Sequence, residues 1–206
     1  IRDREQSRHI AKALRMKKGD MLTLTNGDGN DYGCQINGVS GGLVTLSVCY
    51  KQANNSEPSV KVTLYQGVPK ASKLEDVIQK CTELGIAAIC PTLTHRSVSR
   101  PDEKQAKKKG ERYKKIALEA AQQSGRGIVP EIMDMTELKK AVENDESELK
   151  ILFYEGGGES LKSIIPQDIK SVSVYIGPEG GFEESEVELI KSAGGKIASL
   201  GPRILR

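Results

Sequence analysis

The chain has no tryptophan, and only 4% of its 206 residues are aromatic. Proteins that bind single-stranded nucleic acids broadly stack successive bases on aromatic side chains, so the composition argues against that mode of binding. No apolar run approaches the roughly 18 residues that a membrane-spanning helix needs. The first residues, Ile1-Arg2-Asp3-Arg4-Glu5, also lack the apolar region of a secretion signal. We therefore expect a protein of the cytoplasm.

Cysteine and histidine are scarce as well, with four Cys and two His in the chain. Cys34, Cys49, Cys81 and Cys90 form none of the Cys-x-x-Cys pairs that are typical of structural zinc sites. Each cysteine lies among apolar or small residues, where buried reduced thiols are common. The sequence therefore predicts no metal site and a reducing environment.

The charge that is present is distributed unevenly along the chain. Residues 1–66 carry a net charge of +3, residues 67–130 carry +6 and residues 131–206 carry −6. A basic middle followed by an acidic end indicates that one part of the surface meets a polyanion. A solvated helix face with many charges explains the same pattern and stays an open alternative.

The first third of the sequence predicts a small β-barrel. A short helix is expected from Arg4 to Arg15, followed by strands near residues 21–25, 32–39 and 44–50 that are separated by glycine-rich turns. The last of these strands alternates apolar and polar residues, as a half-buried strand does. Short strands that closely follow one another favour a barrel. The polar segment Asn54–Pro58 reads as a linker, so the first domain is predicted to cover residues 1–58.

From residue 59 onward the pattern changes to alternating strands and helices. Ser72 and Glu75 form a predicted capping box that starts a helix ending at Gly85. A long basic helix is expected from Lys104 to Ser124, with a possible interruption at Gly110. Strands are expected at 60–64, 86–90, 151–154, 171–176 and 196–200, and further helices at 136–144 and 184–193. This alternation predicts a parallel α/β sheet in a second domain of residues 59–206.

Two glycine-bearing loops follow the last two long strands. Ligands of open parallel sheets bind where strands end and loops begin, and the loops Ile176–Phe182 and Leu200–Arg206 have that position. Three glycines within Gly177–Gly181 allow the backbone to approach a ligand closely. The loop lacks both the P-loop pattern and the dinucleotide fingerprint. A simple sharp turn into the next helix is the alternative to a ligand site.

These loops also carry a family resemblance. Ile176-Gly-Pro-Glu-Gly-Gly-Phe182 and Leu200-Gly-Pro-Arg-Ile-Leu-Arg206 are similar to the paired signatures of the bacterial ribosomal RNA small subunit methyltransferase E family, within the SPOUT superfamily. Lys80–Gly85 with His95–Val98 resembles the first family signature, and Glu119–Arg126 with Val129-Pro130 the second. The segment with His9, Leu14-Arg15 and Gly19-Asp20 resembles the PUA-like β-barrel of that family. The resemblance therefore covers nearly the whole chain, in four blocks in the expected order.

The resemblance implies an activity and a fold. It implies methylation of N3 of one uridine in 16S ribosomal RNA, with S-adenosylmethionine as the cofactor, by a homodimer. It also implies a SPOUT-type parallel sheet with a C-terminal trefoil knot, against the general rule that chains do not thread. The family pattern continues beyond Arg206 with a segment containing threonine and glutamate and a final helix, so we expect the C-terminal end of this sequence to be incomplete.

The predicted cofactor site uses the backbone of both loops and the apolar residues beside them. Glycine loops can present N–H and carbonyl groups to an adenine edge, and leucine and isoleucine side chains can sandwich the ring. The predicted cofactor residues are Leu152, Glu155, Ile176, Gly177, Pro178, Glu179, Gly180, Gly181, Leu200, Gly201, Ile204 and Leu205.

Methylation of a uridine N3 needs either a base or a cation that stabilises the developing anion, because this nitrogen is mostly protonated at neutral pH. Arg203 and Arg126 are the candidate cations, and Glu179 is a weaker candidate base. Arg203 could instead pair with an acidic residue. Glu179 could instead cap the following helix, since acidic residues favour helix N-termini.

RNA contacts are expected from the basic segment 96–126 and from a basic patch near residue 15. Such residues mainly contact phosphates, which fixes the register of the RNA, while one target base is unstacked and turned toward the cofactor. The predicted RNA-binding residues are Arg15, Lys17, Lys18, Arg96, Gln122, Gln123 and Arg126. Two other functions stay open: a SPOUT methyltransferase acting on tRNA ribose, and a non-catalytic ribosomal RNA-binding assembly factor.

Overall fold

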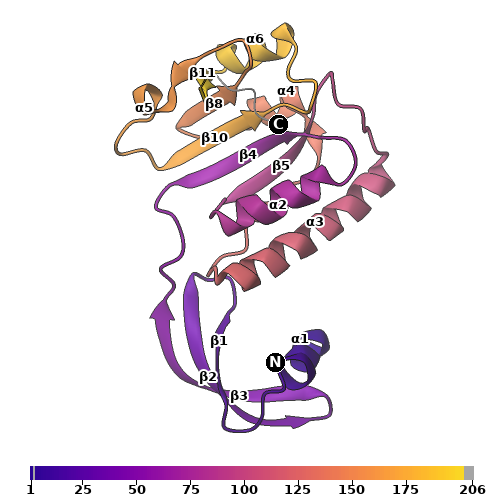
Figure 1. Cartoon of the computed structure of the whole chain (residues 1–206), viewed down its shortest axis with the longest axis vertical. Helices are drawn as coiled ribbons and strands as arrows, with labels where there is room; N and C mark the ends of the chain where they lie inside the picture. The colour runs from indigo at the N-terminus through magenta and orange to yellow at the C-terminus, as the bar shows by residue number, and fades with distance from the viewer. Residues whose placement is uncertain (2, 202–206) are drawn as a thin grey trace. The chain divides into compact units, whose positions relative to one another are not determined.

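The computed structural model describes residue 1 and residues 3–201 (Figure 1). The chain forms two compact units, one made of residues 1–57 and 126–128, and the other of residues 58–125 and 129 onward. The short segment 126–128 follows the longest helix of the second unit in the sequence, but it belongs to the first unit. The two units are described separately below.

The first unit is built on an antiparallel sheet of three strands in the order β1-β2-β3. Its strands are β1 Met21–Thr25, β2 Asn30–Ser40 and β3 Leu43–Ala53. Gly41 and Gly42, with φ of 58° and 79°, form the two-residue turn between β2 and β3, a turn that needs positive φ at both positions. In the described part of the chain these pairings leave the sheet open, so the three strands do not close into the predicted barrel.

A helical segment packs on this sheet. It begins as α1 Arg4–Arg8 and continues as the π-helix η1 His9–Ala13, slightly shorter than the helix predicted to reach Arg15. Asp3 caps α1 by accepting the N–H groups of Glu5 and Gln6. Ile10 of the helix packs against Ile36 and Val44 of the sheet in a small core, which holds the helix on the sheet face.

The second unit contains a larger sheet in the order β6-β5-β4-β10-β8-β11-β9, with β7 beside β5. Every pairing in it is parallel, which confirms the predicted parallel α/β fold. Its strands are β4 Lys61–Gly67, β5 Ala88–Leu93, β6 Glu131–Ile132, β7 Thr136–Glu137, β8 Leu149–Phe153, β9 Glu159–Ser160, β10 Ser171–Ile176 and β11 Lys196–Ser199.

Helices cover both faces of this sheet (Figure 1). The helices are α2 Lys73–Glu83, α3 Glu103–Ser124, α4 Leu138–Glu143, α5 Leu161–Ile164 and α6 Glu184–Ser192. Side chains from α2 and α3 form one apolar core with β4 and β5, including Leu74, Ile78 and Tyr113. Side chains from α4 and α6 form a second core with β8 and β10, including Leu138, Tyr175 and Ile190. The sheet is therefore buried on both sides, as parallel sheets are.

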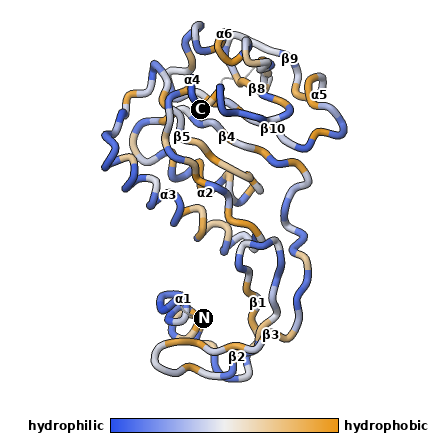
Figure 2. Tube along the Cα trace, turned by 180° about the vertical axis from the view of Figure 1, so that it is seen from behind, coloured by the Kyte–Doolittle hydropathy of each residue, from blue (hydrophilic) through white to orange (hydrophobic). Residues whose placement is uncertain are grey.

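The long helix α3 is continuous through Gly110, contrary to the predicted interruption. The side chain of Asp102 caps its start by accepting the N–H of Gln105 at 2.7 Å, and Gly125 ends it with a positive φ of 71°. Figure 2 shows the beginning of α3 as strongly hydrophilic. No helix among the described residues is long and apolar enough to cross a membrane.

The predicted capping box at the start of α2 is wrong. The Ser72 side chain makes no capping hydrogen bond, since the N–H of Glu75 donates to the backbone carbonyl of Ser72 at 2.9 Å. The Glu75 side chain does not reach back either: it is turned toward α3, where its carboxylate lies 2.5 Å from Arg112. The corresponding contact is found at α6 instead, where the N–H of Glu183 donates to the carboxylate of Glu186 at 2.9 Å.

Candidate functional site

The loop at 177–182 and the first two residues of the second predicted loop lie at the carboxyl-terminal ends of strands in the large sheet. Strands β10, β8 and β11 are adjacent and parallel. The loops that follow them, at residues 177–182, 154–158 and 200–201, therefore lie at the carboxyl-terminal ends of the strands, where such sheets bind ligands. The rest of the last loop, with the predicted residues Arg203, Ile204 and Leu205, lies outside the described residues.

The end of β4 approaches the first of these loops very closely. A Cβ atom added at Gly67 would lie 2.6 Å from the backbone nitrogen of Pro178 and 2.9 Å from the carbonyl carbon of Gly177. The side chain of Gln66 also donates to the carbonyl oxygen of Gly177 at 3.3 Å. Gly67 is thus a site residue that the sequence did not reveal, although a glycine shortly after the strand predicted at 60–64 was a visible signal.

The acidic side chain of the loop is anchored outside it. The carboxylate of Glu179 accepts the backbone N–H of Lys70 at 3.2 Å and the ammonium group of Lys73 at 2.8 Å. The hydrogen bond from Lys73, with smaller contributions from backbone N–H groups, lowers the pKa of Glu179 to about 2. Glu179 therefore joins the 177–182 loop to the start of α2 and the segment just before it, and it does not cap α6.

This arrangement predicts an unusual titration of Glu179. We expect a carboxyl ¹³C NMR titration with a midpoint near 2, and a return toward the ordinary value of 4.5 in Lys73→Met. Because the folded-state pKa is lowered, the stabilisation is present above about pH 4.5 and is lost as the pH falls toward 2. A wild-type midpoint near 4.5 would show that the Lys73 contact does not form in solution.

The segment after β5 contacts the same loop from another side. The guanidinium group of Arg96 donates to the carbonyl oxygen of Gly180 at 2.6 Å. The neighbouring His95 donates its backbone N–H to Glu186 at 2.9 Å, and its Nδ1 lies 3.2 Å from Glu183. Arg96 therefore braces the loop, while its predicted role in RNA binding stays a prediction.

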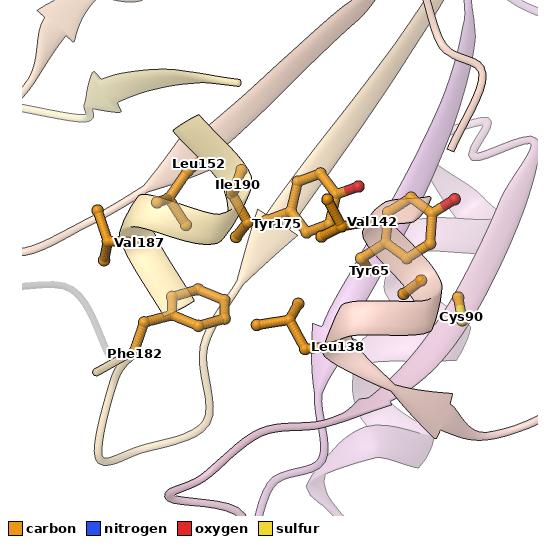
Figure 3. Packing of buried hydrophobic residues seen from close by; sticks show 10 residues of the cluster. Tyr65, Cys90, Leu138, Val142, Leu152, Tyr175, Phe182, Val187 and Ile190 are labelled. Carbon is orange, nitrogen blue, oxygen red and sulfur yellow. The ribbon is translucent and has the colours of Figure 1, made fainter. Parts of the chain in front are cut away.

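The loop ends at Phe182, whose ring points into the apolar core (Figure 3). Its side chain is 3% exposed and packs with α6 residues that include Val187 and Ile190. Leu152, a predicted cofactor residue, is completely buried in the same core. Glu155, another predicted cofactor residue, is exposed near the loop: a Cβ added at Gly181 would lie 3.7 Å from its Oε1.

A buried hydroxyl network lies in the core behind the site. The ring of Tyr175 stacks on that of Tyr65, with centroids 4.7 Å apart, and its hydroxyl donates to Asp145 at 2.7 Å. Ser173 donates to the same carboxylate oxygen. Burial, together with the hydrogen bond to Asp145, raises the pKa of Tyr175, so the phenol stays protonated. The network joins β10, which leads into the 177–182 loop, to the segment before β8.

Arg126 belongs to the first unit and is already paired there. Its side chain is 3% exposed, and Nη2 lies 2.6 Å from Oε2 of Glu57 while Nε lies 3.3 Å from Oε1. Burial raises the pKa of Glu57, but hydrogen bonds from Arg126 and from the N–H of Ile128 outweigh it, and the pKa is lowered overall. The predicted catalytic and RNA-binding roles of Arg126 stay predictions beside this structural one.

Removal of the Glu57 carboxylate should destabilise the first unit. We expect Glu57→Gln to lower its free energy of unfolding by about 2 kcal/mol, because a buried guanidinium loses its charged partner. Hydrogen exchange at the amide of Ile128, which donates to Glu57, measures the change locally. Glu5→Gln, an exposed change in the same unit, is the control. Equal protection in wild type and Glu57→Gln would contradict the prediction.

The other predicted RNA-binding residues are exposed. Arg15, Lys17 and Lys18 are exposed in the first unit, and Gln122 and Gln123 are exposed at the end of α3. Gln123 lines a groove of about 290 Å³ between α2 and α3, together with Glu75, Asp76 and Glu119. This acidic lining is unfavourable for a phosphate beside Gln123. In the part of the chain that the structure describes, no three His, Cys, Asp or Glu residues converge on a potential metal site.

Comparison with known proteins agrees with the fold and the loops. The family model of an RNA methyltransferase domain matches residues 55–206, and that of an RNA methyltransferase PUA domain matches residues 1–49. Together these features define an RNA methyltransferase with an N-terminal PUA domain. Ribosomal RNA small subunit methyltransferase E of Bacillus subtilis (strain 168) is 38% identical over 98% of this chain and 82% of its own length. The chain belongs to the ribosomal RNA small subunit methyltransferase E family, as the sequence signatures indicated.

Two similar solved structures contain the cofactor that the resemblance implies. A methyltransferase of Legionella pneumophila, in complex with S-adenosylmethionine, is 32% identical, with a TM-score of 0.89 over 99% of this chain and 84% of that chain. Ribosomal RNA small subunit methyltransferase E of Neisseria gonorrhoeae, bound to S-adenosylmethionine, is 26% identical, with a TM-score of 0.90 over 98% of this chain and 83% of that chain.

Proposed function

We propose that this chain is an S-adenosylmethionine-dependent methyltransferase that modifies N3 of a uridine in 16S ribosomal RNA of the small ribosomal subunit. The observation that carries the proposal is the meeting of three loops at the carboxyl ends of β8, β10 and β11, in a family whose solved members bind that cofactor.

The residues at this edge fit the proposed cofactor. The glycines at 177, 180 and 181 place no side chain between the loop backbone and a ligand, and Leu200, which is 51% exposed, offers an apolar surface to the adenine ring. The carbonyl groups of Gly177 and Gly180 and the N–H of Gly181 are already hydrogen-bonded within the protein, so the adenine edge would use the other backbone groups of the loop. The carboxylate of Glu155 near Gly181 suits the ribose hydroxyl groups or the positive sulfonium. When bound, S-adenosylmethionine supplies an electrophilic methyl carbon.

In the proposed reaction the protein mainly positions the cofactor and the uridine. Holding the methyl carbon and the uridine in line removes much of the entropic barrier, and the contacts of Gly67, Lys73 and Arg96 fix the loop that does so. We assign Glu179 to this positioning rather than to proton transfer, because a carboxylate with a pKa of about 2 is a weak base at neutral pH.

Arg203 remains our candidate for the cation that stabilises the developing uridine anion. The pairing of Arg126 with Glu57 makes Arg126 the weaker of the two candidates. The family resemblance also supports a trefoil knot, which in the family is completed by the segment that follows the second loop signature, and a homodimer. Both belong to this proposal, as does a cytoplasmic location.

The direct test is methyl transfer from labelled cofactor to purified small ribosomal subunits and, in a separate reaction, to tRNA, each followed by nucleoside mass spectrometry. We expect N3-methyluridine in 16S ribosomal RNA. A 2′-O-methyl nucleoside in tRNA would favour the ribose methyltransferase instead. Salt-dependent binding of ribosomal RNA without any methyl transfer would favour the assembly factor.

A paired variant tests whether the 177–182 loop is the cofactor site. In Gly180→Val the new side chain meets Arg96, since even a Cβ atom would lie 3.3 Å from that residue, and cofactor binding should be lost. In Gly110→Ala, on α3, a Cβ atom meets nothing within 4 Å, so cofactor affinity should stay unchanged. Tight cofactor binding by Gly180→Val would exclude the proposed site.

A further inference from the structure

A basic groove lies in the first unit, and its lining contains none of the residues assigned above to the cofactor or to catalysis. It has a volume of about 260 Å³, and the cationic side chains of Arg4, Arg8 and Lys12 line one side of it. Arg4 and Arg8 are four residues apart on α1, which places them on one face of the helix at a spacing of about 6 Å. Lys12 follows four residues later in η1, so Arg4, Arg8 and Lys12 form a row of three cations along the helical segment.

The opposite wall is the turn between β2 and β3. Val39, Gly41 and Gly42 line it, and Ser7 and Ala11 complete the groove. A Cβ atom added at Gly41 or Gly42 would meet nothing within 4 Å, so this wall is bare backbone beside open space. A bulky ligand can therefore approach the cations without displacing any side chain of the turn.

The cations of the groove are available for a ligand. Among the residues that the structure describes, no carboxylate forms an ion pair with Arg4, Arg8 or Lys12. The nearby acid Asp3 is engaged with the N–H groups of Glu5 and Gln6 at the start of α1.

The row is also held in place by the buried side of the helix. Ser7 is 1% exposed, and its hydroxyl accepts the N–H of Val44 in β3 at 3.2 Å. Ile10 packs in the small core on the same side. The cations consequently project from a fixed surface and lose little additional backbone freedom when they bind a ligand.

We propose that this groove binds the phosphate backbone of the substrate RNA. The inference rests on the proposed function and names a surface for its substrate, separate from Arg15, Lys17 and Lys18. A row of three cations matches a chain of phosphates better than a single anion. The described lining has no aromatic side chain for stacking and no Asn or Gln side chain for reading base edges, so the groove positions RNA without selecting its sequence.

Salt dependence provides a test that is specific for phosphate contacts. Binding of the full chain to transcribed 16S ribosomal RNA is measured at several KCl concentrations, and the slope of log K against log salt concentration is compared between variants. Each lost phosphate contact reduces the steepness of the slope by about 0.7–0.9. We expect that reduction in Arg8→Gln, and roughly three times as much when Arg4, Arg8 and Lys12 are all replaced by Gln.

Lys51→Gln is the matched control. Lys51 lies on the same β2–β3 ribbon, but it pairs with Tyr32 far from the turn and forms an ion pair with Asp28 at 3.7 Å. Its removal should leave the slope unchanged. All these side chains are exposed, so the variants should remain folded, and far-ultraviolet circular dichroism checks this.

Each outcome separates the groove from the enzyme activity. If wild type methylates ribosomal RNA and the triple variant keeps the wild-type slope, the groove proposal is overturned and the proposed function stands. If the slope changes as expected but wild type transfers no methyl group, the groove stands and the proposed function fails. If the variants lose affinity for assembled subunits only, and not for naked RNA, the groove contacts an acidic protein segment and the proposal is overturned.

Discussion

Phe182→Ala is expected to lower the free energy of unfolding of the second unit by about 3–5 kcal/mol. The ring is buried to 97% among Leu138, Val187 and Ile190, and its loss leaves a cavity between α4 and α6. Urea unfolding followed by circular dichroism measures the change. Because Phe182 also ends the 177–182 loop, cofactor affinity measured by calorimetry should fall together with stability.

The control for this change is Leu118→Ala on α3, a residue that is already 39% exposed. The change removes an apolar side chain that is only partly buried, so we expect the free energy of unfolding to fall by less than about 1 kcal/mol. If Phe182→Ala destabilised the protein no more than Leu118→Ala does, the ring would not occupy the core in solution.

Gly67→Ala should reduce the methyl-transfer efficiency, kcat/KM, by about 100-fold. The new methyl group would overlap the backbone at Gly177 and Pro178, at 2.6–2.9 Å, and neither strand β4 nor the proline ring can give way cheaply. The loop must therefore shift by an amount on the order of 1 Å, and a displacement of that size in a positioned site has an effect of this magnitude.

The kinetic pattern distinguishes a shifted loop from a general loss of structure. Gly67→Ala should keep most of its circular dichroism signal while losing both cofactor affinity and transfer, and Gly110→Ala should keep all three. Wild-type kinetics in Gly67→Ala would show that the close approach of β4 to the loop is not needed for the reaction.

Local patterns in the sequence predicted the separate elements of the second unit well. The alternating segment Ser171–Ile176 is strand β10 at the predicted bounds, and the basic run before Ser124 is helix α3. The two-residue strands β6, β7 and β9 were missed, because so short a segment has no periodicity to detect. The residues at 136–137 that the sequence assigned to a helix accordingly pair with β5.

The contacts around the candidate site could not be predicted from local patterns. The loop is contacted by Gly67, Lys73 and Arg96 because β4 lies beside β10 and the segments after β4 and β5 fold back toward the loop. The strand order β4-β10-β8-β11 brings these segments together, and residues that are neighbours in the sequence do not predict that order. The same is true of Arg126, whose partner Glu57 is 69 residues away. Its charge made Arg126 a candidate for catalysis. Its burial depends on an acid far away in the sequence, so neighbouring residues could not predict it.

The pairing of β4 with β10 also has a consequence for how the protein is made. Lys61 pairs with Ser171, so about 110 residues must be synthesised after β4 before its neighbour exists. At roughly 5–20 residues per second this interval lasts on the order of 5–20 s. During that time β4 offers one unpaired edge to other nascent chains or to chaperones, and because long-range parallel pairing is slow, the loop that contacts Gly67 is among the last parts of the molecule to form.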